Sequence, residues 1–168
     1  MSSNINNVVG WKRCFIRYVD GSFEIAGVFA SIFGPLKSKQ ECTCNKSECW
    51  CGFSAHRTKT GAFRYRPLDQ PIAETIMSDN VRFTGGRKKE YIVSNQQNVT
   101  KILWPNWCKE TGCTDLGSGL FAHSDGKIEV RCNTHGANIS LEKAYSITGV
   151  KSLWLSKDYT IWAKAKAV

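Results

Sequence analysis

Several features are missing from this 168-residue chain, and each absence narrows its class. No apolar run approaches the roughly 18 residues of a membrane-spanning helix. The first residues show no basic segment followed by an apolar one, so a secretory signal is not expected and the predicted location is cytoplasmic. Repeats and low-complexity tracts are also missing. Hydrophobic residues make up 42% and charged residues 22%, which excludes wholesale disorder.

Common catalytic motifs are absent too. The sequence contains no His-Glu-x-x-His, no Walker phosphate loop, no Gly-x-Ser-x-Gly and no zinc-deaminase pattern. The pair Cys49-Trp50 with the downstream His123 resembles the Cys-Trp and His of some viral papain-like leader proteases. The polar run after Cys49 is a poor helix to carry a nucleophile, and a bound metal would sequester the thiol. We therefore expect a non-enzymatic protein, with a cysteine protease as a remote alternative.

Eight cysteines without an export signal imply a reducing compartment and thiols rather than disulfides. Cys108 and Cys113 form a Cys-x4-Cys pair, and Cys132 and His135 form a Cys-x-x-His pair. Three thiolates and one imidazole complete a tetrahedral set for zinc, with no position left for water, so a structural site is expected. Gly136 lets the chain leave the second turn at positive φ. The alternative is a set of buried free thiols with an unrelated histidine.

A second cysteine cluster lies earlier in the chain and comprises Cys42, Cys44, Cys49 and Cys51. Its four thiolates could hold a second zinc ion, and His56 is close enough in sequence to replace one of them. Each Cys-x-Cys pair must bend to chelate, because residues two apart in an extended chain share a face. A redox-active thiol cluster is the alternative. The predicted cofactor is therefore zinc, with one or two ions per chain, and Cys14 remains without an assigned role.

Strand patterns dominate the chain. Three hairpins are predicted around Asp20-Gly21, Gly85-Gly86 and Asp125-Gly126. A further strand is expected at 61–66, a final hairpin at 150–163, and short helices at 69–78 and 140–147, the second capped by Ser140. The predicted fold class is small α+β, mostly antiparallel, with zinc replacing part of the core.

The polar segment 95–98 is the best candidate for a boundary. It would separate a β-rich unit with the Cys-rich loop, residues 1–95, from a zinc-knuckle unit with a short helix and terminal hairpin, residues 96–168. One compact domain is the alternative.

The segment Cys49-Trp-Cys-Gly-Phe-Ser-Ala55, with the later Cys-x4-Cys and Cys-x-x-His, resembles a set of small uncharacterised bacterial and phage proteins. These carry a Cys-x-Cys-Gly-aromatic-x-Ala segment ahead of a Cys/His pair. The resemblance covers short motifs only. It implies metal binding and a prokaryotic setting, and no activity.

The chain carries 23 Lys and Arg against 14 Asp and Glu, a net charge of +9. Between residues 52 and 89, eight basic residues face three acids; the eight are Arg57, Lys59, Arg64, Arg66, Arg82, Arg87, Lys88 and Lys89. Basic residues bind phosphates through counterion release, and neighbouring aromatics can stack on bases. Charge runs are more often plain solvated surface, which is the alternative here.

The leading hypothesis is a zinc-stabilised, zinc-finger-like protein that binds nucleic acid, DNA or RNA, through these eight residues. The second is a zinc-scaffolded adaptor or inhibitor of an acidic protein, which would use tryptophans as interface anchors: Trp50, Trp104, Trp107, Trp154 and Trp162.

Overall fold

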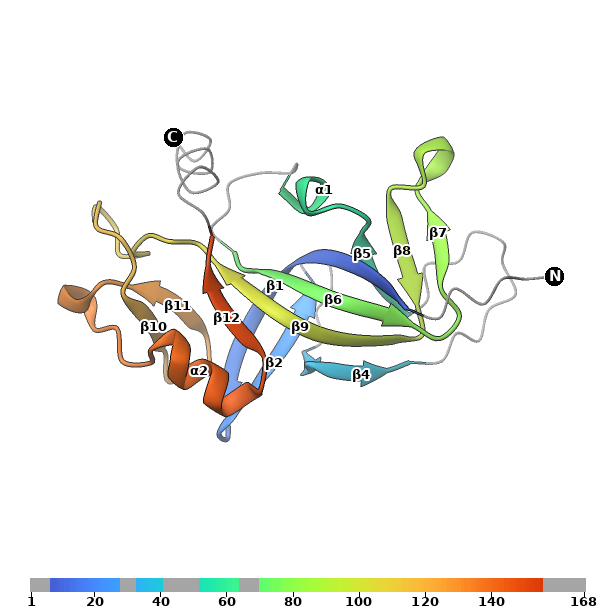
Figure 1. Cartoon of the computed structure of the whole chain (residues 1–168). Coiled ribbons are helices and arrows are strands. Elements are labelled where there is room, and N and C mark those ends of the chain that lie inside the picture. Colours follow the sequence, from blue (N-terminus) through green and yellow to red (C-terminus); the bar gives the residue numbers. More distant parts are fainter. Residues whose placement is uncertain (1–6, 28–32, 41–51, 64–69, 156–168) are drawn as a thin grey trace.

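The fold is mostly antiparallel β-sheet with two short α-helices, as seen in a computed structural model that describes residues 7–27, 33–40, 52–63 and 70–155 (Figure 1). This agrees with the α+β prediction. The elements are β1 Val8–Val19, β2 Ser22–Gly27, β3 Gly34–Pro35, β4 Lys37–Lys39, β5 Phe53–His56, α1 Lys59–Phe63, β6 Ile72–Ser78, β7 Arg82–Thr84, a 3-10 turn Gly86–Lys88, β8 Tyr91–Ser94, β9 Gln96–Trp104, β10 Gly119–Ala122, β11 Ile128–Arg131, a second 3-10 turn Asn133–His135, α2 Leu141–Thr148 and β12 Lys151–Trp154.

One large sheet organises the molecule, with its strands in the order β12-β9-β6-β1-β5-β8-β7. β2 pairs with β1 and β3, and β4 pairs with β9. β10 and β11 form a separate two-stranded sheet. The only parallel pair among the described strands is β9 with β12. Residues 105–150, which contain the predicted metal ligands, therefore form the crossover between two neighbouring parallel strands.

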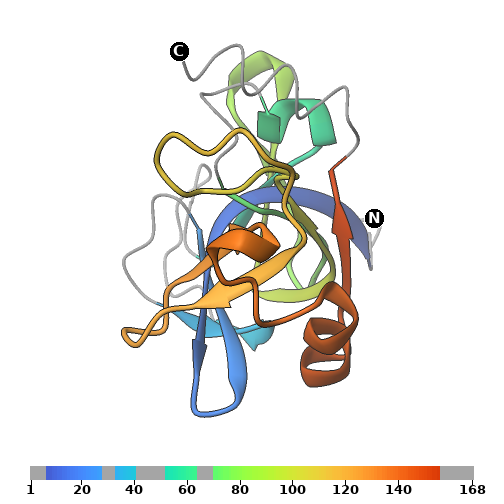
Figure 2. The ribbon, with the colours of Figure 1, turned by 90° about the vertical axis from the view of Figure 1, so that its left-hand side faces the viewer.

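The long strand β1 changes partner along its length. Residues 8–13 pair with β6, and residues 14–19 pair with β2. The second half also reaches the β10–β11 hairpin, since the Tyr18 N–H donates to the Gly126 carbonyl at 2.8 Å and Arg17 bridges to Lys127. Figure 2 shows the β1–β2 hairpin (blue), the β10–β11 hairpin (orange) and α2 (orange-red) below the arc formed by the first half of β1. The large sheet and the hairpin thus enclose one core.

That core is built from all parts of the chain. It includes Cys14, Ile25, Ile102, Trp104 and Leu120, each 5% exposed or less. A second cluster packs α1 against β6 and β9 through Phe63, Ile72 and Leu103. A third joins β5, β6 and β8 through Ala55, Met77 and Ile92. Burial of this apolar surface is the main force that holds the sheet together.

Two predicted elements are wrong. A strand was predicted at 61–66, but 61–63 belong to helix α1, which Thr58 caps: its Oγ1 accepts from the Gly61 N–H at 3.0 Å. Residues 64–66 lie outside the description. Residues 72–78 form the central strand β6 instead of a helix. β6 pairs with β1 on one side and β9 on the other, and its burial has the period of two of a strand: Ala73, Thr75 and Met77 are buried, and Glu74, Ile76 and Ser78 are half-buried.

The segment expected to be a linker is also not a linker, since Gln96, Gln97 and Asn98 belong to β9. They pair with β4 on one side and β6 on the other. The sheet is thus continuous across the position where the sequence placed a boundary.

The other element predictions within the described residues are confirmed. The three hairpins form at the predicted turns. Ser140 caps α2 by accepting from the Lys143 N–H, and the helix ends at Gly149. The terminal hairpin is seen only as β12, because residues 156–168 lie outside the description.

No helix in the described part of the chain is long and apolar enough to cross a membrane.

Candidate metal centre

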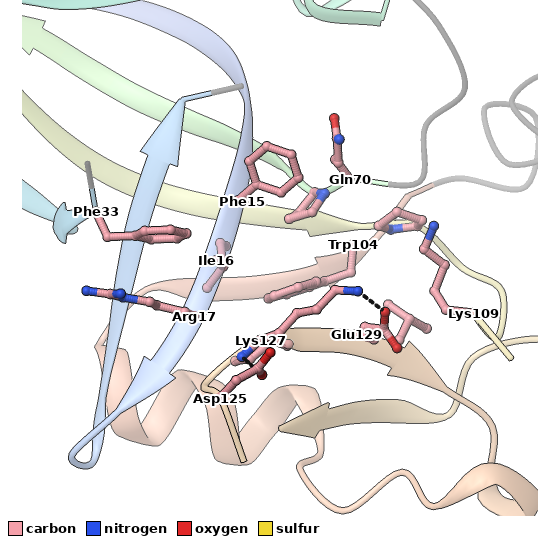
Figure 3. Close-up of a pocket in the computed structure, with 14 residues that line it drawn as sticks. Phe15, Ile16, Arg17, Phe33, Gln70, Trp104, Lys109, Asp125, Lys127 and Glu129 are labelled. Carbon is pink, nitrogen blue, oxygen red and sulfur yellow. Dashed lines mark hydrogen bonds and ion pairs between the residues drawn. The ribbon is translucent and has the colours of Figure 1, made fainter. Parts of the chain in front are cut away.

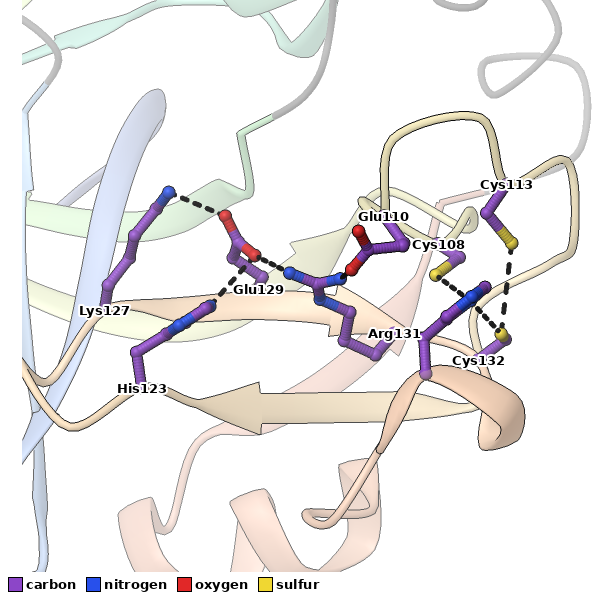
Figure 4. A network of polar contacts seen from close by, with 9 residues as sticks. Cys108, Glu110, Cys113, His123, Lys127, Glu129, Arg131 and Cys132 are labelled. Atoms are coloured by element: carbon purple, nitrogen blue, oxygen red, sulfur yellow. Dashed lines mark hydrogen bonds and ion pairs between the residues drawn. The ribbon is translucent and has the colours of Figure 1, made fainter.

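Two loops at the end of the β10–β11 hairpin bring the four predicted ligands together (Figure 4). The first loop carries Cys108 and Cys113 and is closed by the Cys113 N–H donating to the Glu110 carbonyl at 3.0 Å. The second begins as β11 ends, where the His135 N–H donates to the Cys132 carbonyl at 3.1 Å. Gly136 follows at φ 87°, as the sequence predicted.

The ligand atoms lie at distances that suit one metal ion. All four fall within 4.8 Å of one another. The Nδ1 atom of His135 is 3.1 Å from the Cys132 sulfur and 3.5 Å from the Cys108 sulfur, and the Cys113 and Cys132 sulfurs are 4.0 Å apart. Tetrahedral zinc places its ligands about 3.5 to 3.8 Å apart. A separation of 4.0 Å is about twice a disulfide bond, and these cysteines are free.

The thiols at this centre do not ionise independently. Burial opposes the thiolate of Cys108, but backbone N–H groups of Glu110 and Cys132, together with the neighbouring thiols, lower its pKa to about 7. The backbone N–H of Asp115 favours the Cys113 thiolate, but burial and the neighbouring sulfurs of Cys108 and Cys132 outweigh it and raise the pKa of Cys113 to about 11. Three thiolates this close repel one another unless a cation lies between them. The donor set therefore fits a divalent metal.

An ion-pair network supports the first loop. Arg131 on β11 bonds Glu110 of that loop with one nitrogen and Glu129 with another, the second at 2.6 Å. Glu129 also pairs with His123 at 3.0 Å and Lys127 at 2.6 Å. Burial disfavours the carboxylate, yet these donors lower the pKa of Glu129 to about 2. These ion pairs thus connect the loop of Cys108 and Cys113 to β11, the strand that directly precedes Cys132 (Figure 4).

The sequence did not single out this network. Glu110, Glu129 and Arg131 looked like ordinary surface charges of a hairpin. Their one available signal was position: Arg131 directly precedes Cys132, and Glu110 lies two residues after Cys108. Groups so close to ligands commonly orient them.

The earlier cysteine cluster, Cys42, Cys44, Cys49 and Cys51, lies outside the described residues. His56, offered as a substitute ligand, is on β5, where its ring packs on that of Tyr91 at 4.7 Å. Burial lowers the pKa of His56. The proposed protease nucleophile, Cys49, also lies outside the described residues. Its proposed partner His123 forms a hydrogen bond with Glu129.

Six of the eight predicted basic residues are described, and the sheet brings them to neighbouring strands. Arg57 follows β5 and Lys59 begins α1, while β7, β8 and the turn between them carry the rest: Arg82, Arg87, Lys88 and Lys89. β5, β8 and β7 are consecutive strands of the sheet. One Arg57 nitrogen donates to the Lys89 carbonyl at 3.3 Å, and its guanidinium lies 4.9 Å from the ring of Phe83. We call these six the basic hairpin surface; Arg64 and Arg66 lie outside the description.

Phe63 ends helix α1 and is 2% exposed, so it belongs to the core and does not offer a surface for base stacking. The tryptophans offered as anchors are largely internal where they are described. Trp104 is 1% and Trp107 is 9% exposed, and Trp154 is partly buried. Trp50 and Trp162 lie outside the described residues.

Comparisons with protein-family models, with curated proteins and with solved structures gave no match. The chemistry of the site therefore rests on its own geometry.

Proposed function

We propose that the protein is a non-enzymatic, zinc-stabilised nucleic-acid-binding protein. Its zinc ion is held by Cys108, Cys113, Cys132 and His135, and its basic hairpin surface contacts phosphates. The observation that carries the proposal is the mutual approach of four ligand atoms to within 4.8 Å.

Zinc is the favoured ion because three thiolates with one imidazole form a soft donor set of tetrahedral number. Four protein ligands fill that coordination, which supports a structural ion rather than a catalytic one. The ion would join the loop after β9 to the end of β11, in addition to the Lys109 N–H that donates to the Val130 carbonyl at 2.9 Å and the Arg131–Glu110 ion pair.

The basic hairpin surface supports the partner. Arg57, Arg87, Lys88 and Lys89 are all exposed. Gly85, Gly86 and Lys89 have positive φ, so the turn backbone departs from ordinary strand geometry at the place where three cations follow one another. Such turns can present N–H groups to a phosphate. Cations at a projecting turn suit a backbone-directed, sequence-independent contact.

Salt-dependent binding tests this partner. Zinc-loaded protein is titrated with random single-stranded DNA, double-stranded DNA and single-stranded RNA at several salt concentrations. The triple variant R87Q/K88Q/K89Q should bind more weakly, and its log-affinity against log-salt slope should be smaller by about 2 to 3, or roughly 0.7 to 0.9 for each lost phosphate contact.

A charge-matched control separates contact from net charge. The variant K37Q/K143Q/K151Q removes three exposed lysines from β4, α2 and β12. It should retain nearly the wild-type slope. Equal losses in both triple variants, or no binding at low ionic strength, would show that this surface is not the nucleic-acid contact.

A further inference from the structure

A cavity of about 380 Å³ lies between the large sheet and the β10–β11 hairpin (Figure 3). Its walls come from the second half of β1, the end of β9 and the start of β11. The volume falls near the lower end of the range for small-molecule sites. None of its lining residues belongs to the basic hairpin surface.

Aromatic rings form much of this cavity. Phe15 is 42% exposed although it is a large apolar side chain on a strand. Phe33 lies on the same lining, with the Arg17 guanidinium 4.5 Å from its ring centre. Figure 3 shows Trp104 between Ile16 and Lys127. Flat, accessible rings are the surfaces on which planar heteroaromatic ligands stack.

Trp104 adds a donor that lacks a partner. Its side chain is 1% exposed, and its indole Nε1 has no hydrogen-bond partner within the described part of the chain. A buried donor left without an acceptor is unfavourable, because it has lost its hydrogen bond to water and gained none in return. A ligand atom that accepts from this N–H would remove that penalty.

The charge of the lining favours an anion. Arg17, Lys109 and Lys127 are on the walls, against Asp125 and Glu129; Arg17 is paired with Glu24 at 2.5 Å, so the phosphate is assigned to the two lysines. Glu129 is already shared with Arg131 and His123 from outside the cavity, at 2.6 and 3.0 Å. Lys127 also pairs with Glu129, at 2.6 Å, but Glu129 divides one negative charge among three partners, and the Lys127 side chain is 62% exposed.

We propose that this cavity binds a nucleotide, with the base stacked on the aromatic lining, an acceptor atom of the base facing the Trp104 indole, and the phosphate beside Lys109 and Lys127. The cavity shares no residue with the basic hairpin surface, so each of the two proposals can be refuted without affecting the other. The same chemistry is offered by a free nucleoside monophosphate and by one residue of a single strand.

The test uses the full zinc-loaded chain labelled with 15N. The indole resonance of Trp104 is assigned by its loss in Trp104→Phe and followed during titrations with AMP, CMP, a dA hexamer and inorganic phosphate. We expect a saturable shift with a mononucleotide if the free form is the ligand, and with the hexamer alone if a strand residue is. No saturable shift with any nucleotide, or the same response to inorganic phosphate, overturns the proposal.

Two variants and a control test the contacts. Trp104→Phe keeps a ring but removes the donor, and Lys127→Met removes an exposed cation; each should weaken binding about three- to tenfold, measured by calorimetry. Arg87→Gln, on the separate basic hairpin surface, should bind the nucleotide as the wild type does. Unchanged affinity in both cavity variants, or an equal loss in the control, refutes the site.

Discussion

His135 turns its Nδ1 atom, not Nε2, toward the sulfurs of Cys108 and Cys132. A Cys-x-x-His turn is short, and the nitrogen nearer the backbone is the one that reaches an ion held beside Cys132. The ligands are thus set by local turns, which explains why spacing alone predicted this site.

Replacing one ligand should remove the ion. Cys132→Ala is expected to lower the zinc content by one equivalent per chain, because three remaining donors no longer close the tetrahedron. The matched control is Cys14→Ala, a cysteine that is buried but lies outside the cluster and should keep the full content. Elemental analysis of both purified proteins gives the answer. Equal zinc in Cys132→Ala and the wild type would contradict the ligand assignment.

Lys12 is a half-buried cation that the sequence analysis did not single out. Its Nζ donates to Oε1 of Gln97 at 2.7 Å, and Gln97 is 4% exposed. Burial lowers the pKa of Lys12 to about 8 from 10.5, and the nearby Cys14 only partly offsets this. Between these values the unfolded chain holds one more proton than the folded chain, so stability attributable to Lys12 rises with pH.

The variant Lys12→Met should lack that rise. We expect the free energy of unfolding of the chain with Lys12, minus that of Lys12→Met, to increase by about 1 to 3 kcal/mol from pH 8 to 10.5. Urea unfolding at several pH values measures it. Both proteins carry Cys14→Ala, because Cys14, whose pKa burial raises to about 12, interacts with Lys12 and would not cancel in the subtraction. An unchanging difference would mean that Lys12 titrates as it does in water.

Strands and helices were predicted correctly where residues close in sequence determine them, and incorrectly where contacts with distant strands do. Hairpins with Asp-Gly or Gly-Gly turns and the Ser140-capped helix formed where expected. β6 did not, since Ile72 and Ile76 are spaced as on a helix and only the strands on both sides decide its form. The polar start of β9 was predicted to be a linker for a related reason. Gln97 can be buried in the sheet because Lys12 donates a hydrogen bond to its side-chain oxygen, and the sequence does not show this contact.

Strand β1 depends on a close approach at Gly10. A Cβ there would lie 2.7 Å from that of Ala55 and 3.2 Å from Met77 Cγ. Gly10→Ala should therefore destabilise the protein by about 1 to 3 kcal/mol through overpacking. Gly34→Ala is the control, because its nearest neighbour would be 3.9 Å away. Thermal unfolding compares them, and equal midpoints would contradict the packing described.

The loop of Cys108 and Cys113 should depend on Arg131. Arg131→Met removes the bond to Glu110, and we expect zinc affinity to fall about 10- to 100-fold, as for other groups that support metal ligands. Lys127→Met is the matched control, since it takes another cation from Glu129 but leaves the loop attached. Competition with a chromogenic chelator measures both. Similar affinities in the two variants would rule out a special role for Arg131.

The candidate metal centre lies in the crossover between β9 and β12. Removal of the ion should therefore destabilise the whole crossover and β12, not only the two ligand loops. Structural zinc contributes on the order of 10 kcal/mol in small zinc domains. Chelation should therefore increase hydrogen exchange across residues 108–139 and in β12, with less change in β1 and β6. Mass spectrometry with and without chelator, followed by zinc reloading, tests this. Uniform exchange with and without the ion would contradict it.

β12 lies at the border of the large sheet and covers one side of β9 at residues 101–104. If residues 105–150 lose their structure, β12 can separate from β9. The backbone N–H and C=O groups of residues 101–104 are then unpaired and can bond to a strand of another chain. Ile102 and Trp104 would be uncovered with it. A metal ion bound at the candidate centre would then oppose self-association, and we expect the zinc-depleted protein to precipitate as a β-rich aggregate before it unfolds as a monomer.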